Sequence, residues 1–201
     1  MRDGILLAPH SSHATLLDAV LPEAGLVKQV LLALAGTAVL TLSAKLQVPF
    51  WPVPMTMQTF AVLVIAMAFG PKLGAATVLL YLAEGAMGLP VFAGTPAKGI
   101  GVAYMMGPTG GYLVGFVLSA FLVGTLAHKG WDRSVSMTLL AMMLGTILIF
   151  LTGVIWLATL IGVEKAVQFG LTPFLAGAAF KIALAAAVMP LAWKVLQRSK
   201  G

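Results

Sequence analysis

The stretch MGPTGGYLVGF, residues 106–116, joins an irregular turn to an apolar segment. Its proline and two adjacent glycines suit a bent backbone, because glycine adopts conformations closed to other residues and proline interrupts regular hydrogen bonding. The stretch lies inside an uncharged run, 99–127, which exceeds the roughly 20 residues that a helix needs to cross a bilayer. The pattern therefore predicts a turn at the mouth of a membrane helix.

The composition of the whole chain indicates an integral membrane protein. The 201 residues are 60% hydrophobic and 9% charged, with a mean hydropathy of +1.03, whereas a soluble domain carries about 25% charged residues. Two further uncharged runs, 46–71 and 134–163, are long enough to span a membrane as helices. Neither shows the short alternating segments of a membrane β-barrel. An all-α membrane fold is predicted.

Six spanning helices are predicted, at about 27–46, 55–70, 73–89, 110–128, 134–162 and 174–196. Residues 1–26 lack a continuous apolar core, so we expect an N-terminal tail and not a cleaved signal peptide. Residues 197–201 are expected to form a short C-terminal tail. No internal repeat is evident, which gives little support to an inverted-repeat transporter fold.

The basic residues predict the orientation. They favour the side of the termini over the opposite side by eight to three. The eight are Arg2, Lys28, Lys72, Lys129, Arg133, Lys194, Arg198 and Lys200, and the three are Lys45, Lys98 and Lys165. Because cytoplasmic loops carry the excess of Lys and Arg, both termini are predicted in the cytoplasm of a multi-pass cell-membrane protein. Lys45, at the outer end of the first segment, is expected to reach the lipid headgroups.

Polar side chains within the predicted spans mark a candidate binding site. A charge at the bilayer centre costs about 2.5–3.5 kcal/mol on insertion scales, yet Lys181 lies about seven residues, or roughly 10 Å, into the sixth segment. Thr56, Gln58, Glu84 and Tyr112 lie at the outer ends of their segments. Because successive helices alternate in direction, these groups share one level of the membrane. A pocket open to the outside, sealed by the turn before Tyr112, is predicted.

Each of these residues also has a structural interpretation. Lys181 and Glu84 can neutralise one another without a ligand, and Thr56 and Gln58 can cap a helix. Aromatic residues near segment ends also fit the interfacial belt of membrane proteins, which we prefer for Trp156. The other aromatic residues in question are Tyr81, Tyr104, Tyr112 and Trp51. The sequence leaves these alternatives open.

No motif for catalysis or metal binding is evident. The stretch GTPAKGIG has the wrong spacing for a phosphate-binding loop, and no metalloprotease or serine-hydrolase motif occurs. The chain has no Cys, and its three His lie in the tail and at a helix end. We therefore expect neither an enzyme nor a resident cofactor or metal. A small bundle with an outward pocket and no motor predicts a solute-binding protein that takes its energy from a partner.

Four stretches of the chain carry a family resemblance. They are VPMTMQTFAVL (53–63), YLAEGAMGLPVFAG (81–94), GPTGGYLVGF (107–116) and TPFLAGAAFKIALAA (172–186). They resemble the BioY family, the biotin-specific substrate-capture (S) components of energy-coupling-factor (ECF) vitamin transporters, over about residues 27–196. The resemblance implies a six-helix S-component fold that binds biotin near the extracytoplasmic face. It also implies a transmembrane coupling protein and two cytosolic ABC-type ATPases, which alone would use ATP.

The resemblance implies roles for individual residues. Lys181 matches the family lysine of the sixth helix and is expected to anchor biotin, through its carboxylate. Gly94 and Ala93 fall where some members place an Asn, so this contact is left to the backbone. Ala178 replaces an acid that many members carry three residues before the lysine. We hypothesise that Glu84 takes over this role, by balancing Lys181 or by accepting the ureido N–H groups.

The chemistry of biotin suits the other residues of the predicted site. Its ureido ring offers two N–H donors and a carbonyl acceptor, its thiophane ring is apolar, and its valerate is anionic. Gln58 and Thr56 are expected to bond the ureido group. Aromatic walls are expected from Tyr81, Phe92, Tyr104, Tyr112 and Phe174.

A ridge of small side chains on the first segment is a predicted partner interface. Ala33, Thr37 and Thr41 recur every four residues, and such ridges let membrane helices approach closely. Docking of the coupling protein is one interpretation, and packing within the bundle is the other. A solitary carrier without an ATPase module is the alternative function, a membrane enzyme is a third, and self-association is left open.

Overall fold

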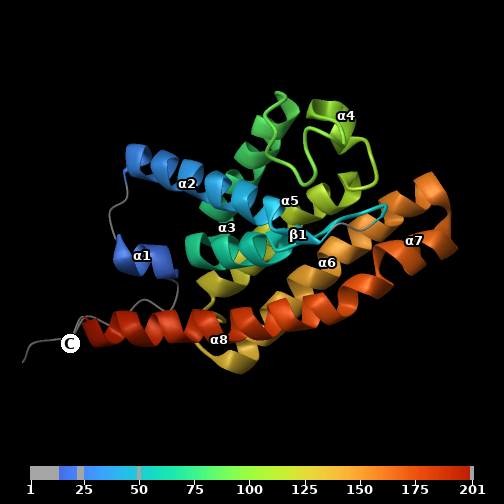
Figure 1. The fold of residues 1–201 in the computed structure, drawn as a ribbon. Helices are drawn as coiled ribbons and strands as arrows, with labels where there is room; N and C mark the ends of the chain where they lie inside the picture. Colours follow the sequence, from blue (N-terminus) through green and yellow to red (C-terminus); the bar gives the residue numbers. More distant parts are fainter. Residues whose placement is uncertain (1–13, 22–24, 49–50, 200–201) are drawn as a thin grey trace, which may run out of the picture.

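The computed structural model describes residues 14–21, 25–48 and 51–199. The predictions for residues 1–13, 22–24 and 200–201, including the charges of Arg2 and Lys200, lie outside these ranges. The described chain is a bundle of long helices (Figure 1). They are α2 (Leu26–Lys45), α3 (Gln58–Ala86), α5 (Gly110–His128), α6 (Val135–Ile161) and α8 (Leu175–Ser199). The short elements are α1 (Leu16–Val20), α4 (Gly101–Met105), α7 (Val163–Gly170), the 3-10 helix η1 (Thr172–Phe174) and the paired strands β1 (Gln47–Val48) and β2 (Met55–Thr56).

Helix α3 is two antiparallel arms joined at Gly70. Gly70 has φ 80° and ψ −179°, a conformation essentially restricted to glycine, and Pro71 suits the start of the second arm because a first-turn N–H has no helical partner. A Cβ on Gly74 would lie 2.8 Å from the Cα of Ala66, which is impossible along a straight helix. The arms match the second and third predicted segments.

Five helical stretches of the described chain are long and apolar enough to cross a membrane. They are Leu26–Lys45, Gln58–Ala86, Gly110–His128, Val135–Ile161 and Val163–Arg198. The predicted number was six, because the hydropathy pattern separates the two arms of α3. Whether each arm crosses the bilayer stays a prediction, as does the cytoplasmic placement of the termini.

Glycines allow the central helices to approach closely. Helices α3 and α5 pack at the centre, α6 packs on α5, and α2 and α8 lie further out against α3 and α6 respectively. A Cβ on Gly111 would lie 2.4 Å from the carbonyl oxygen of Thr152, and one on Gly115 would lie 2.8 Å from the Cα of Ile149. This small-xxx-small pair sets the spacing of α5 and α6.

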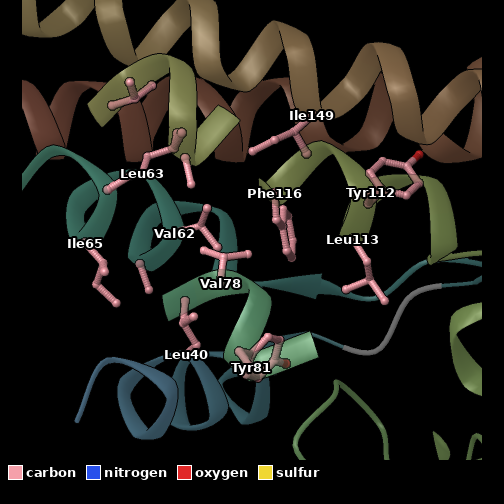
Figure 2. Packing of buried hydrophobic residues seen from close by; sticks show 14 of the residues in the cluster. Leu40, Val62, Leu63, Ile65, Val78, Tyr81, Tyr112, Leu113, Phe116 and Ile149 are labelled. Atoms are coloured by element: carbon pink, nitrogen blue, oxygen red, sulfur yellow. The ribbon is translucent and has the colours of Figure 1, made fainter. Parts of the chain in front are cut away.

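The core is built from side chains of all the central elements (Figure 2). Leu40 of α2 and Val78 of α3 are fully buried, and Phe116 of α5 and Ile149 of α6 are almost so. Because lipid is as apolar as these side chains, their close packing and not their transfer from water holds the helices together.

The end of the bundle that carries Gly70 is covered by α1. Thr15 caps this helix and exchanges hydrogen bonds with Asp18 in a capping box. A Cβ on Gly70 would lie 2.8 Å from Cγ2 of Thr15, and Arg133 donates a 3.2 Å hydrogen bond to the carbonyl oxygen of Ala14. Helix α1 is therefore part of the packed structure.

Candidate ligand-binding cavity

A cavity lies between α3, α5, α6 and α8, below the segments 53–56 and 92–109. The space open to the centre of a water molecule is about 70 Å³, and most of its lining is apolar. Seven of the residues predicted for the site line it: Thr56, Gln58, Phe92, Tyr104, Tyr112, Phe174 and Lys181. The fold therefore brings together residues that lie up to 125 positions apart in the sequence.

Lys181 of α8 reaches across the cavity to the start of α3. Its Nζ donates to the carbonyl oxygen of Thr56 and, at 3.0 Å, to Oγ1 of Thr59. An ammonium group has three N–H donors, so these two bonds with described residues leave one donor for a ligand. The position of the amine is fixed by two neutral acceptors, and its charge is available to an anion.

A chain of hydrogen bonds fixes the amide of Gln58. The Tyr81 hydroxyl donates to the carbonyl oxygen of Val91 at 3.0 Å, and Nε2 of Gln58 donates to the Tyr81 oxygen at 2.7 Å. Because a hydroxyl has one proton, its donation to Val91 makes it an acceptor toward Gln58. This bond leaves the amide carbonyl and the second N–H of Gln58 without a bond to Tyr81, and Gln58 lines the cavity. Tyr81 itself is fully buried, so it supports Gln58 and is not a wall of the cavity.

Aromatic rings form the sides of the cavity. The ring of Phe92 stacks on Tyr104 with centroids 4.9 Å apart and meets Tyr81 edge-on at 5.4 Å. Phe92 fits there because Gly85 has no side chain, since a Cβ on Gly85 would lie 2.0 Å from the ring. These contacts hold Phe92 in one orientation.

Tyr112 connects three helices at the other side of the cavity. Its ring lies against Gly153 of α6, where a Cβ would be 2.3 Å away, and its hydroxyl donates to the carbonyl oxygen of Gly170 at 2.7 Å. That bond holds the end of α7, from which η1 carries Phe174 to the cavity.

Glu84 does not take the role hypothesised from the sequence. Among the described residues it is not part of the cavity lining and forms no ion pair with Lys181. Its Oε1 is instead 2.9 Å from the Thr37 hydroxyl of α2. The second arm of α3 turns this side chain toward α2, so the acid missing at Ala178 is not replaced by Glu84.

The expectation for Gly94 is also corrected. Gly94 does not line the cavity, whereas its neighbour Ala93 does. Gly94 has φ 72°, and a Cβ there would meet the Lys98 side chain at 2.8 Å. Its role is to turn the backbone after the two lining residues.

The small-residue ridge of α2 faces the bundle. Ala33 is 7% exposed and Thr37 is 4% exposed, while Thr41 is half-buried. Because Thr37 hydrogen-bonds Glu84 of α3, the ridge serves packing within the chain. It is not an exposed docking surface for a coupling protein.

Trp156 supports the turn at residues 106–111, which precedes Tyr112. Its indole N–H donates to the carbonyl oxygen of Gly107 at 2.9 Å, and a Cβ on Gly111 would lie 2.3 Å from its side chain. A Cβ on Gly110 would lie 3.0 Å from the indole and 2.1 Å from the carbonyl oxygen of Met105. Trp156 therefore has a structural role at this turn, and its place in the interfacial belt stays a prediction. Gly111 is required because α6 packs this tryptophan against the turn, and Gly110 is required by the close carbonyl of Met105.

Sequence reasoning missed several lining residues, including Thr59, Thr109, Thr146 and Phe116. Thr59 and Thr109 are polar and lie within the family-like stretches 53–63 and 107–116, so the sequence did offer a reason to include them. Thr146 carried no such signal, because a helical threonine commonly bonds a carbonyl of its own helix, as Thr146 does with Met142 at 2.8 Å.

Comparisons with known proteins give a consistent set of similarities. The model of the BioY family matches residues 12–198. The chain is 38% identical over 163 residues to the biotin transporter BioY of Thermotoga maritima, covering 81% of this chain and 94% of that protein. It is 36% identical over 148 residues to the probable biotin transporter BioY of Pyrococcus horikoshii, covering 74% and 85% respectively.

A solved structure shares the fold. It is the crystal structure of the S-component for biotin from an ECF-type ABC transporter. The similarity has a TM-score of 0.69 and 26% sequence identity, and it covers 84% of this chain and 92% of the other.

Proposed function

The chain belongs to the BioY family, and we propose that it binds biotin in the cavity around Lys181 and delivers it across the cell membrane. The family is one of transporters and not of enzymes. The observation that carries the proposal is the Lys181 ammonium, which Thr56 and Thr59 hold inside a membrane bundle with one N–H donor left. A charge in such a place is costly, so its presence indicates a function.

The charge of the cavity suits a monoanion. Lys181 is the one Lys, Arg, Asp or Glu among the described lining residues, so no carboxylate competes with a ligand for its ammonium. The valerate of biotin supplies a single negative charge on a flexible chain. A charge-assisted hydrogen bond from Lys181 to that carboxylate would be stronger than a neutral one.

The amide of Gln58 suits the ureido ring. Because Tyr81 holds the Gln58 amide and Gln58 lines the cavity, its carbonyl can accept a ureido N–H. The stacked pair of Phe92 and Tyr104 offers an apolar face to the thiophane ring. We assign Gln58 to the ureido group of biotin, Lys181 to its carboxylate, and the aromatic rings to the apolar thiophane ring.

The charge pattern suggests the direction of transport, and the S-component fold suggests its energy source. We propose that the cavity opens to the outside, because the described helix ends remote from it carry most of the basic residues and cytoplasmic ends are basic. Lys28, Lys72, Lys129, Arg133, Lys194 and Arg198 form this group. A transmembrane coupling protein and two cytosolic ABC-type ATPases would supply the energy, as the S-component fold suggests.

Binding of radiolabelled biotin to the detergent-purified chain tests the ligand. We expect saturable binding that unlabelled biotin displaces fully and desthiobiotin displaces at higher concentration, while thiamine and riboflavin have no effect. Displacement by thiamine or riboflavin, or absence of saturable binding, would refute the proposal. Reconstitution in liposomes without partners should give no biotin accumulation, and accumulation there would favour the solitary carrier.

A further inference from the structure

Lys45, the last residue of α2, is bound to the protein and not directed to lipid headgroups. Its Nζ donates to the carbonyl oxygen of Phe92 at 2.9 Å, to the carbonyl oxygen of Thr95 at 3.1 Å and to the Thr95 hydroxyl at 2.9 Å. An ammonium group has three N–H donors, so the side chain is saturated by these contacts. The expectation that Lys45 reaches the headgroups is corrected.

The partners of Lys45 belong to the lining loop, residues 87–100, which joins α3 to α4. This loop supplies Phe92 and Ala93 to the cavity. The carbonyl that Lys45 bonds is the one between those two residues, and the Thr95 hydroxyl donates to the same oxygen at 2.6 Å. Lys45 therefore contacts the backbone at the point where the loop meets the cavity.

The backbone of the lining loop has mainly local support beyond Phe92. Its hydrogen bonds among the described residues join Thr95 to Phe92, Lys98 to Gly94 and Gly99 to Pro96. These bonds shape the loop but do not attach it to a helix. Attachment comes from the Tyr81 hydrogen bond to Val91 and the Phe92 ring on one side, and from Lys45 on the other.

We propose that Lys45 is a positioning residue for ligand retention, whose ammonium holds residues 92–95 over the cavity so that bound biotin escapes slowly. The inference rests on the proposed function for its ligand. Its physical basis is that hydrogen bonds to a charged donor are stronger than neutral ones and that three of them converge on one short segment. Removal of the ammonium should let residues 93–95 move away while the ring contacts of Phe92 keep the rest of the cavity intact.

The dissociation rate of radiolabelled biotin, measured after addition of excess unlabelled biotin, tests whether Lys45 slows the escape of the ligand. We expect Lys45→Met to raise the dissociation rate about tenfold with little change in the association rate. Lys45→Arg should stay near the wild-type rate, because guanidinium N–H groups also bond carbonyl oxygens. Lys28→Met, an exposed lysine at the opposite end of the same helix, is the matched control and should have no effect. A wild-type rate in Lys45→Met, or an equal rise in Lys28→Met, would overturn the proposal.

A second readout needs no ligand. The chain has no Cys, so Ala93→Cys introduces a single thiol at a position that is 4% exposed. Adding Lys45→Met to that variant should raise its rate of maleimide labelling about tenfold, since opening of the segment would expose position 93. Equal labelling rates in Ala93→Cys with and without Lys45→Met would refute the proposed role of Lys45. Failure of the wild type to bind biotin would refute the proposed function and leave this measurement decisive for Lys45.

Discussion

The side chains of Gln58 and Tyr81 meet at 2.7 Å although they are 23 residues apart on one helical element. A straight helix would separate them by about 34 Å. They meet because α3 reverses at Gly70, and this reversal places a buried hydroxyl behind the amide that faces the cavity. The binding site thus depends on a backbone feature at the far end of both arms.

Tyr81→Phe should weaken biotin binding about tenfold by releasing the Gln58 amide from its orientation. Equilibrium binding of radiolabelled biotin measures the effect. The same substitution in a Gln58→Ala background should have little further effect, because the two side chains act as one unit. Additive losses in the double variant would show that Tyr81 does not act through Gln58.

Gly70→Ala should destabilise the protein by about 1–3 kcal/mol, because an alanine at this φ and ψ is strained. Its Cβ would also meet Thr15 at 2.8 Å. Thermal unfolding in detergent measures the loss. Gly177→Ala is the matched control, since a Cβ there has no neighbour within 4 Å. Equal melting temperatures for the two variants would contradict the account of the α3 reversal.

The buried carboxyl of Asp132 should make the stability of the protein depend on pH. It lies in the loop between α5 and α6, is fully buried and accepts a hydrogen bond from the Trp193 indole. The Arg133 guanidinium lies 4.7 Å from the same indole ring. Burial raises the pKa of the Asp132 carboxyl above its ordinary value, against the opposing effects of the Trp193 hydrogen bond and the Arg133 charge.

Because the folded pKa of Asp132 is raised, the folded state binds this proton more tightly than the unfolded state. Its contribution to stability is therefore greatest below the unfolded pKa and decreases as the pH rises through the folded pKa. Thermal unfolding at a series of pH values should show this decrease in the wild type and not in Asp132→Asn. Glu164→Gln, an exposed acid on α7, should keep the wild-type profile. A profile unchanged by Asp132→Asn would contradict this assignment.

Glu84→Gln should leave biotin affinity within about twofold of the wild type. The reason is that Glu84 faces Thr37 on α2 and lies away from the cavity, and a glutamine oxygen can accept the same hydrogen bond. Titration with radiolabelled biotin measures the affinity. A severe loss would restore the hypothesis made from the sequence, in which Glu84 replaces the acid absent at Ala178.

Hydropathy and motifs predicted much of the fold. The predicted segments 110–128 and 134–162 match α5 (Gly110–His128) and α6 (Val135–Ile161), and the resemblance of four stretches to the BioY family is confirmed by the family match. The helical membrane fold of S-component type is confirmed as well. These features depend on local composition and on continuous stretches, which a sequence shows directly.

The partners of Lys45, Glu84 and Trp156 were not predictable in the same way. Each of these side chains bonds a residue nearly 50 positions away, at separations of 47, 47 and 49. Such contacts depend on how each helix is rotated about its axis. In a membrane bundle both the lipid-facing and the core-facing sides are apolar, so the hydrophobic pattern that fixes rotation in a soluble helix is absent.

Biotin titration of the Lys181→Met variant tests the central claim most directly. Lys165→Met, an exposed lysine on α7, is the matched control for loss of one positive charge. We predict a loss of affinity of roughly 100-fold in Lys181→Met, because a buried charged partner of the ligand is removed, and wild-type affinity in Lys165→Met. Equal affinity for biotin in the wild type and Lys181→Met would contradict the account.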